Sequence, residues 1–219
     1  MARLRAMADP RAAASAARFG IKGEGIYGIP MPRLRAFARE IGKDHRLALQ
    51  LWETGSNSAR HLAVMIDHPA LVTEAQMEAW VRDFNSWDVC DGACWNFFDR
   101  TPFAWKKAIA WTRRRPELER RAGYVLIAGL APHDTEAPDR AFLTFLPIIE
   151  RGADDDRNFV KKAVNWALRE IGKRSRGLNR AAVRTARAIR DQGTAGARWI
   201  AADALRELSS PAVQERLGR

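Results

Sequence analysis

Residues 159–173, FVKKAVNWALREIGK, contain the pattern that decides the fold. Apolar side chains recur every three to four residues, so a helix here would bury one face and expose the other. Acidic residues at 154–156 precede the pattern, and negative charge is favourable at a helix N-terminus. We therefore predict a helix over Asp156–Lys173. Its predicted buried face consists of Val160, Ala163, Val164, Ala167, Leu168 and Ile171.

A basic residue followed by an apolar run recurs along the chain. It is found in ARHLAVMI from Ala59, RRAGYVLIA from Arg120, VKKAVNWAL from Val160 and ARWIAADAL from Ala197. From Arg121 onward the recurrences lie about 40 residues apart, the spacing of HEAT and armadillo helix-pair repeats. We predict an all-α fold, a curved α-solenoid of antiparallel HEAT/armadillo-like helix pairs, as a single domain over residues 1–219. An irregular all-helical globule is the alternative.

The remaining segments also have the helical period, and no alternating strand pattern is evident. The Gly-rich run at 20–32 is expected to be a loop, and Thr73 with Gln76 forms a capping box. Asn179 is expected to cap the helix that follows it. Further helices are expected at 10–19, 32–43, 44–53, 58–67, 73–84, 87–98, 103–114, 116–131, 140–149, 180–191 and 195–208, followed by a short tail.

The composition bounds the possible partners and compartments. A formal net charge of +11 favours a polyanion, with nucleic acid first and an anionic membrane surface second, although an Arg-rich proteome could produce part of the excess. No apolar run is long enough to span a membrane, and the N-terminus has no secretory h-region. Cys90 and Cys94 are expected to be core residues, because two thiols without a nearby His pair make no zinc site. We predict a cytoplasmic, nucleoid-associated protein without metal or cofactor.

The stretch at 85–98, NSWDVCDGACWNFF, contains a misplaced carboxylate. On a helical projection the apolar arc contains Trp87, Cys94, Trp95 and Phe98, and Asp91 falls inside it, one turn after Trp87. A carboxylate there is costly unless it is paired or faces a polar cavity. An anion and an aromatic ring on adjacent turns make a place where a cation could sit. Asp88 falls on the polar side, in the first turn of the helix.

Trp166 is a large apolar residue on the polar face of its own predicted helix, the reverse of the case of Asp91. It lies away from the apolar arc, on the side of Phe159, and is flanked by Lys162 and Arg169. A large aromatic on a basic face suits stacking on a nucleotide beside phosphate-binding cations. Burial against a neighbouring helix pair is the alternative.

Two other arginines are candidate anion-binding residues. Arg121 begins a helix that is apolar nearly all round, and a buried guanidinium needs an anion, either an internal carboxylate or a bound phosphate. Its neighbour Arg120 is expected to be a solvated surface charge. Arg198 precedes the last apolar run, so that the leading bases of the repeats would form a positive track.

At these residues the sequence resembles the DNA alkylation repair family, the AlkD-like glycosylases built from HEAT-like repeats. The resemblance extends from FGIKGEGIYGIPMPRLRAFAREIGKDH through SWDVCD and NFVKKAVNWALREIGKR to ARWIAADALREL. It implies that Trp87, Asp91 and Trp166 are catalytic and that Arg121 grips the DNA backbone. Lys162, Arg169 and Arg198 are the other DNA-binding candidates.

The resemblance implies a repair glycosylase that hydrolyses the N-glycosidic bond of cationic N3- or N7-alkylated purines in double-stranded DNA, without base flipping. Because such a base is already a good leaving group, the enzyme must stabilise an oxocarbenium-like sugar and place a water. Asp91 would do both, and the two tryptophans would hold the deoxyribose and the lesion. A monomer is expected. The alternatives are a non-catalytic HEAT-repeat binder of DNA junctions or bulges and a scaffold for an acidic protein.

Overall fold

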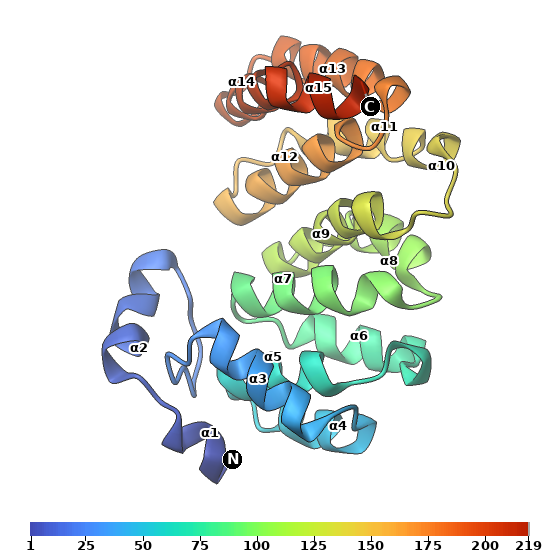
Figure 1. Cartoon of the computed structure of the whole chain (residues 1–219). Helices are drawn as coiled ribbons and strands as arrows, with labels where there is room; N and C mark the ends of the chain where they lie inside the picture. Colours follow the sequence, from blue (N-terminus) through green and yellow to red (C-terminus); the bar gives the residue numbers. More distant parts are fainter. Residues whose placement is uncertain (219) are drawn as a thin grey trace. The chain divides into compact units, whose positions relative to one another are not determined.

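The computed structural model describes residues 1–218, in which all regular elements are helices (Figure 1). The chain divides into two compact units, unit 1 from Met1 to Pro102 and unit 2 from Phe103 onward, and each is described by itself. The prediction of a single domain over 1–219 stays a prediction. No helix within 1–218 is long and apolar enough to cross a membrane.

Unit 1 contains seven α-helices and three short 3₁₀ turns among its described residues. The α-helices are α1 (Ala2–Ala6), α2 (Pro10–Ala16), α3 (Met31–Ile41), α4 (His45–Glu53), α5 (Asn57–Ile66), α6 (Glu74–Arg82) and α7 (Trp87–Asn96). The 3₁₀ turns are η1 (Ala17–Phe19), η2 (Pro69–Leu71) and η3 (Phe98–Arg100). Helix α5 packs against α3, α4 and α7, and is therefore the central helix of the unit. The Gly-rich run is a loop, as predicted.

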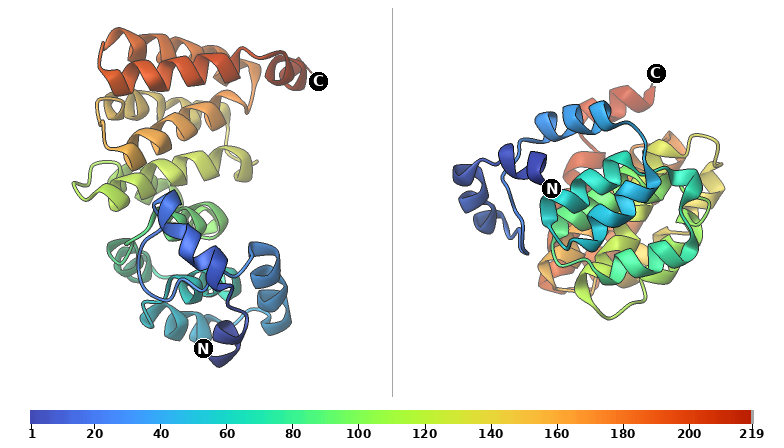
Figure 2. Two further views of the ribbon diagram at one scale, coloured as in Figure 1. Left: turned by 90° about the vertical axis from the view of Figure 1, so that its left-hand side faces the viewer. Right: turned by 90° about the horizontal axis from the view of Figure 1, so that it is seen from below.

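Unit 2 is built from successive helix pairs. Its helices are α8 (Ala104–Trp111), α9 (Glu117–His133), α10 (Asp139–Leu143), α11 (Leu146–Gly152), α12 (Asn158–Gly172), α13 (Arg176–Asp191), α14 (Ala195–Leu208) and α15 (Pro211–Gly218). Helix α9 pairs with α8, and α14 pairs with α13. Helix α12 lies between α9 and α14 and packs against both, as the left view of Figure 2 shows.

The predicted repeat is confirmed in the packing of unit 2. Helices α9, α12 and α14 begin at Glu117, Asn158 and Ala195, which are 41 and 37 residues apart. Side-chain hydrogen bonds between these helices repeat at the same interval. Three of them join residues 38 positions apart: Arg121 to Phe159, Asn165 to Asp203, and Arg169 to Glu207. The all-α, HEAT-like fold class is therefore confirmed.

Side-chain caps account for where several helices begin. Thr73 Oγ1 accepts from Gln76 N at 3.1 Å, so the predicted start of α6 is confirmed. Thr194 Oγ1 accepts from Ala197 N at 3.0 Å in the same way. The predicted cap at Asn179 is wrong, because Ser175 already caps α13 and accepts from Leu178 N at 3.1 Å. Asn179 is buried instead, and its amide donates to the carbonyls of Gly172 and Leu208.

Prolines explain two further differences from the predicted helices. The helix expected at 140–149 is divided into α10 and α11, and Pro147 occupies the first turn of α11. Proline has no N–H to continue a preceding helix but fits a first turn well. The expected tail forms α15, which begins at Pro211. The helix expected at 87–98 ends at Asn96 and is followed by η3.

Candidate functional site

Helix α7 of unit 1 holds the first group of predicted site residues. Its buried face consists of Val89, Cys90, Ala93 and Cys94. The expectation that both cysteines are core residues is therefore confirmed. Burial raises the pKa of the Cys94 thiol, and the neighbouring Cys90 raises it further.

Trp87, Asp91 and Trp95 follow one another at four-residue intervals along α7, and each is only half-buried. The helical projection places Asp91 among apolar side chains, and the structure leaves it half-buried, whereas Val89, Cys90, Ala93 and Cys94 form the buried face of the helix. Asp91 is consequently a carboxylate that solvent can reach, between two tryptophans.

Trp87 is fixed by the N-terminal segment of unit 1. Its Nε1 donates to the carbonyl oxygen of Phe19 at 2.9 Å, across 68 residues of sequence. The ring also lines a cavity of about 1060 Å³ that is bounded by residues from η1, the Gly-rich loop, α3, α5 and α7. The position of Trp87 therefore depends on docking of the segment that ends at Phe19.

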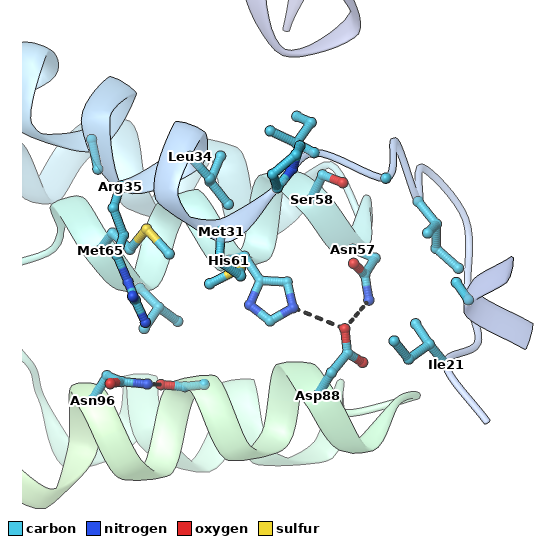
Figure 3. Close-up of a pocket in the computed structure, with 18 of the residues that line it drawn as sticks. Ile21, Met31, Leu34, Arg35, Asn57, Ser58, His61, Met65, Asp88 and Asn96 are labelled. Atoms are coloured by element: carbon cyan, nitrogen blue, oxygen red, sulfur yellow. Dashed lines mark hydrogen bonds and ion pairs between the residues drawn. The ribbon is translucent and has the colours of Figure 1, made fainter. Parts of the chain in front are cut away.

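Asp88 is the polar centre of that cavity wall. Its Oδ2 accepts from Asn57 Nδ2 at 3.0 Å and pairs with His61 Nε2 at 2.9 Å, and its Oδ1 accepts from the Ser86 hydroxyl. Figure 3 shows Asn57 and His61 both directed at this carboxylate. Burial alone would raise the pKa of Asp88, but the His61, Ser86 and Asn57 contacts outweigh it and lower the pKa to about 2.

The second group of predicted residues lines a groove of about 350 Å³ in unit 2. Helix α12 supplies one face of it, with Lys162, Trp166 and Arg169 at helical spacing. The prediction that Trp166 lies away from the apolar arc is confirmed, since Val160, Val164 and Leu168 on the other face are fully buried. The complete lining is Arg121, Lys162, Asn165, Trp166, Arg169, Trp199 and Asp203.

Arg121 is buried, as predicted. It is 5% exposed, its guanidinium donates to the carbonyl of Phe159, and its Cζ lies 6.0 Å from the centre of the Phe159 ring. The expectation for Arg120 is wrong, because Arg120 is half-buried and pairs with Asp155 at 3.3 Å. The acidic residues that precede α12 thus neutralise Arg120, while Arg121 lines the groove.

Polar side chains line much of the groove, and acidic residues neutralise part of its positive charge. Trp166 is half-buried and its Nε1 donates to Glu170 Oε1 at 3.1 Å. Arg169 is bonded to Glu207, which also pairs with Lys173 at 2.9 Å. These contacts hold the pKa of Glu207 low, against the effect of its burial. Lys162 is exposed at the rim.

Arg198 does not line this groove. It is exposed and donates to the carbonyl of Gly193. Its neighbour Trp199 lines the groove instead, with 41% of the residue exposed and Lys161 Nζ 5.4 Å from the centre of the ring. The sequence interpretation missed Trp199, although it lies on the polar face of α14, opposite the buried Ala197, Ile200 and Ala204. An aromatic residue on a polar helix face was the same signal that identified Trp166.

Comparison with known proteins agrees with this description. A solved structure is similar over 100% of this chain and 94% of its own, with a TM-score of 0.79 and 20% sequence identity. The protein in that structure is described as one of a new family of proteins related to the HEAT-like repeat DNA glycosylases with affinity for branched DNA structures. No curated protein matches this sequence. Residues 1–208 match the family of the DNA alkylation repair enzyme. The chain therefore belongs to the DNA alkylation repair enzyme family.

Proposed function

We propose that this protein is a DNA glycosylase that releases cationic N3- or N7-alkylated purines from double-stranded DNA without base flipping, with Asp91 as its catalytic carboxylate. The observation that supports this role most directly is that Asp91 is half-buried between Trp87 and Trp95 on its helix, and not enclosed in the core. A carboxylate that can approach DNA stabilises a developing oxocarbenium ion electrostatically and orients the attacking water. The bond between C1′ and the base nitrogen breaks and the alkylated base leaves as a neutral purine, while water supplies the hydroxyl at C1′ and releases its second proton to the solvent.

Trp87 and Trp166 are proposed to contact the deoxyribose and the lesion through their aromatic faces, which attract cations. In unit 2, Arg121, Lys162 and Arg169 are proposed to bind backbone phosphates. Arg121 is preferred over Arg120 because Arg121 lines the groove with Trp166 and Arg120 does not. Arg198 would contribute only long-range attraction, since it lies outside the groove lining. A monomeric, cytoplasmic protein remains our expectation.

Release of N7-methylguanine from alkylated duplex DNA tests this proposal. The wild-type protein should release the base, and Asp91→Asn should be slower by about 10²- to 10³-fold, the effect of removing one preorganised electrostatic group. Glu53→Gln is the matched control, because Glu53 is an exposed carboxylate of unit 1 on α4 and its removal changes the net charge equally. Equal rates for wild type and Asp91→Asn would remove Asp91 from the mechanism, and no release by the wild type would end the glycosylase proposal.

A non-catalytic binder of DNA structures is the second candidate. Two observations favour it: the affinity for branched DNA described for the similar solved structure, and the +11 net charge of this chain. It predicts tighter binding to three- and four-way junctions than to a duplex of equal length, with no base release. Base release that depends on Asp91 would exclude it as the full function.

A further inference from the structure

The cavity of unit 1 is too large to be a packing defect. Voids in protein interiors rarely exceed the size of a water molecule, whereas pockets for ligands have volumes of about 300–1,000 Å³. This cavity measures about 1060 Å³. Its walls are mainly apolar, with Ile21, Ile26, Met31, Leu34 and Met65 among the lining residues. Figure 3 shows several of these side chains around the open space between α3, α5 and α7.

Cationic side chains line the same cavity. Arg35 and Arg39 lie one turn apart on α3, Arg100 comes from η3, and Lys43 follows α3. Within residues 1–218, none of Arg35, Arg39 and Arg100 forms an ion pair with an acidic side chain. Like charges one turn apart destabilise a helix. This arrangement therefore favours a bound anion.

The positive charges at the cavity repel one another, and the acidic group in the lining does not neutralise them. Lys43 Nζ donates to the carbonyls of Met65 at 3.1 Å and Asp67 at 2.6 Å. Burial lowers the pKa of Lys43, and Arg100 lowers it further in spite of the opposing effect of Asp67. Asp88 is the only acidic residue among those that line the cavity, and His61, Asn57 and Ser86 already satisfy its carboxylate. The remaining positive charge faces the cavity.

Two aromatic residues complete the lining. Trp87 is half-buried, and Phe19 is 68% exposed, which is unusual for a phenylalanine. The hydrogen bond from Trp87 Nε1 to the carbonyl of Phe19 holds the two residues next to each other. Aromatic rings and cations that line one cavity are the combination that binds single-stranded nucleic acid, because bases stack on the rings while phosphates contact the cations.

We propose that this cavity binds the unpaired strand of a branched or frayed DNA. Bases would enter the apolar space beside Phe19 and Trp87, and successive phosphates would contact Arg35, Arg39 and Arg100. A ligand with a single anionic headgroup would neutralise one of these cations, whereas a phosphodiester chain neutralises several at once. The inference rests on the proposed DNA-directed function, and it adds a site in unit 1 that distinguishes unpaired from paired strands.

Fluorescence anisotropy with a labelled ten-nucleotide oligothymidine tests this site. The full chain should bind the oligonucleotide, and Arg35→Ser/Arg39→Ser should weaken binding by about tenfold and reduce the salt-dependence slope by about 1.4, the loss of two single-strand phosphate contacts. The matched control is Arg33→Ser/Arg46→Ser, which removes two exposed arginines of unit 1 that do not line the cavity. This control should change the dissociation constant for the oligonucleotide by less than about twofold.

A second variant tests the apolar space without changing the charge. Met65 is half-buried and lines the cavity, so Met65→Trp should fill part of it and weaken oligonucleotide binding. Circular dichroism and thermal unfolding establish that each variant is folded. Equal losses in the two double variants would overturn the proposal, since the binding would then follow net charge alone. Binding of phosphatidylserine vesicles in place of oligothymidine would also overturn it.

Base release from alkylated duplex DNA by the wild-type protein is measured separately. Oligonucleotide binding that depends on Arg35 and Arg39 supports the cavity site even when no base is released, in which case only the glycosylase proposal fails. Base release by a protein that does not bind oligothymidine leaves the glycosylase proposal intact and overturns the cavity site.

Discussion

His61 of α5 and Asp88 of α7 form a hydrogen-bonded pair, with Nε2 of the imidazole 2.9 Å from Oδ2 of the carboxylate. The pair joins two helices of unit 1 at the wall of its cavity. Asn57 and Ser86 contact the same carboxylate, so that three side chains stabilise one negative charge. A half-buried charge with this many partners contributes to stability only while it is ionised.

We expect this cluster to make the stability of the protein depend on acid pH. The pKa of Asp88 is lowered from 3.8 to about 2 on folding, so folding favours the ionised form. Its contribution of about 2 kcal/mol is therefore fully present above pH 4 and is lost as the pH falls through 2. Urea unfolding of the wild type and of Asp88→Asn between pH 7 and pH 2 measures this contribution to the free energy of unfolding. The difference in unfolding free energy should shrink toward low pH, whereas Glu53→Gln should follow the wild-type curve throughout.

The two adjacent arginines of α9 should differ in their effects. Arg121→Met leaves the carbonyl of Phe159 without its charged donor, and we expect a loss of about 1–3 kcal/mol in stability together with weaker DNA binding. Arg120→Met removes a mostly buried ion pair with Asp155, but Arg157 still donates to that carboxylate, so we expect a loss of only about 1 kcal/mol in stability. Denaturant unfolding and duplex-DNA anisotropy on both variants compare them. A larger loss of DNA affinity in Arg120→Met would contradict the assignment of Arg121 as the phosphate-binding residue.

Trp199 should contribute to DNA binding more than to folding. It is 41% exposed and lines the groove with Trp166, so Trp199→Ala should weaken DNA binding by about 1–3 kcal/mol if a base or sugar stacks on the ring. The unfolding free energy should change little. Leu143→Ala is the control, because Leu143 is 44% exposed in the same unit and does not line the groove. Equal affinities for the two variants would exclude Trp199 from the interface.

Gly123 should be required for the α8–α9 packing. A Cβ at this position would collide with the backbone of Thr112 and Trp111, which neither helix can relieve without moving. We expect Gly123→Ala to destabilise the protein by about 1–3 kcal/mol, as overpacking generally does. Gly177→Ala is the matched control in unit 2, since a Cβ there would make only ordinary contacts. That substitution should be neutral or slightly stabilising, and similar losses in both variants would contradict the packing explanation.

The helical period identified most helices correctly because it reflects burial of one face, which is a local property of the chain. The faces of α12 are the clearest example, since the predicted apolar residues are buried and Trp166 lies on the other side. The same method left the burial of Asp91 open, and only the structure shows that Asp91 is half-buried while Ala93 and Cys94 beside it are fully buried. It also failed at Asn179, where the competing cap at Ser175 was not recognised.

The sequence by itself determined the all-helical class, the repeat near 40 residues, the basic character and the candidate residues Trp87, Asp91, Trp166 and Arg121. These follow from periodicity, composition and motif, which need no knowledge of distant contacts. Only the tertiary structure decided that Asp155 neutralises Arg120, that Trp199 joins Trp166, and that His61 meets Asp88 across 27 residues. Such pairings depend on how helices dock. Docking is governed by the shapes of whole faces, and no local pattern in the chain encodes them individually.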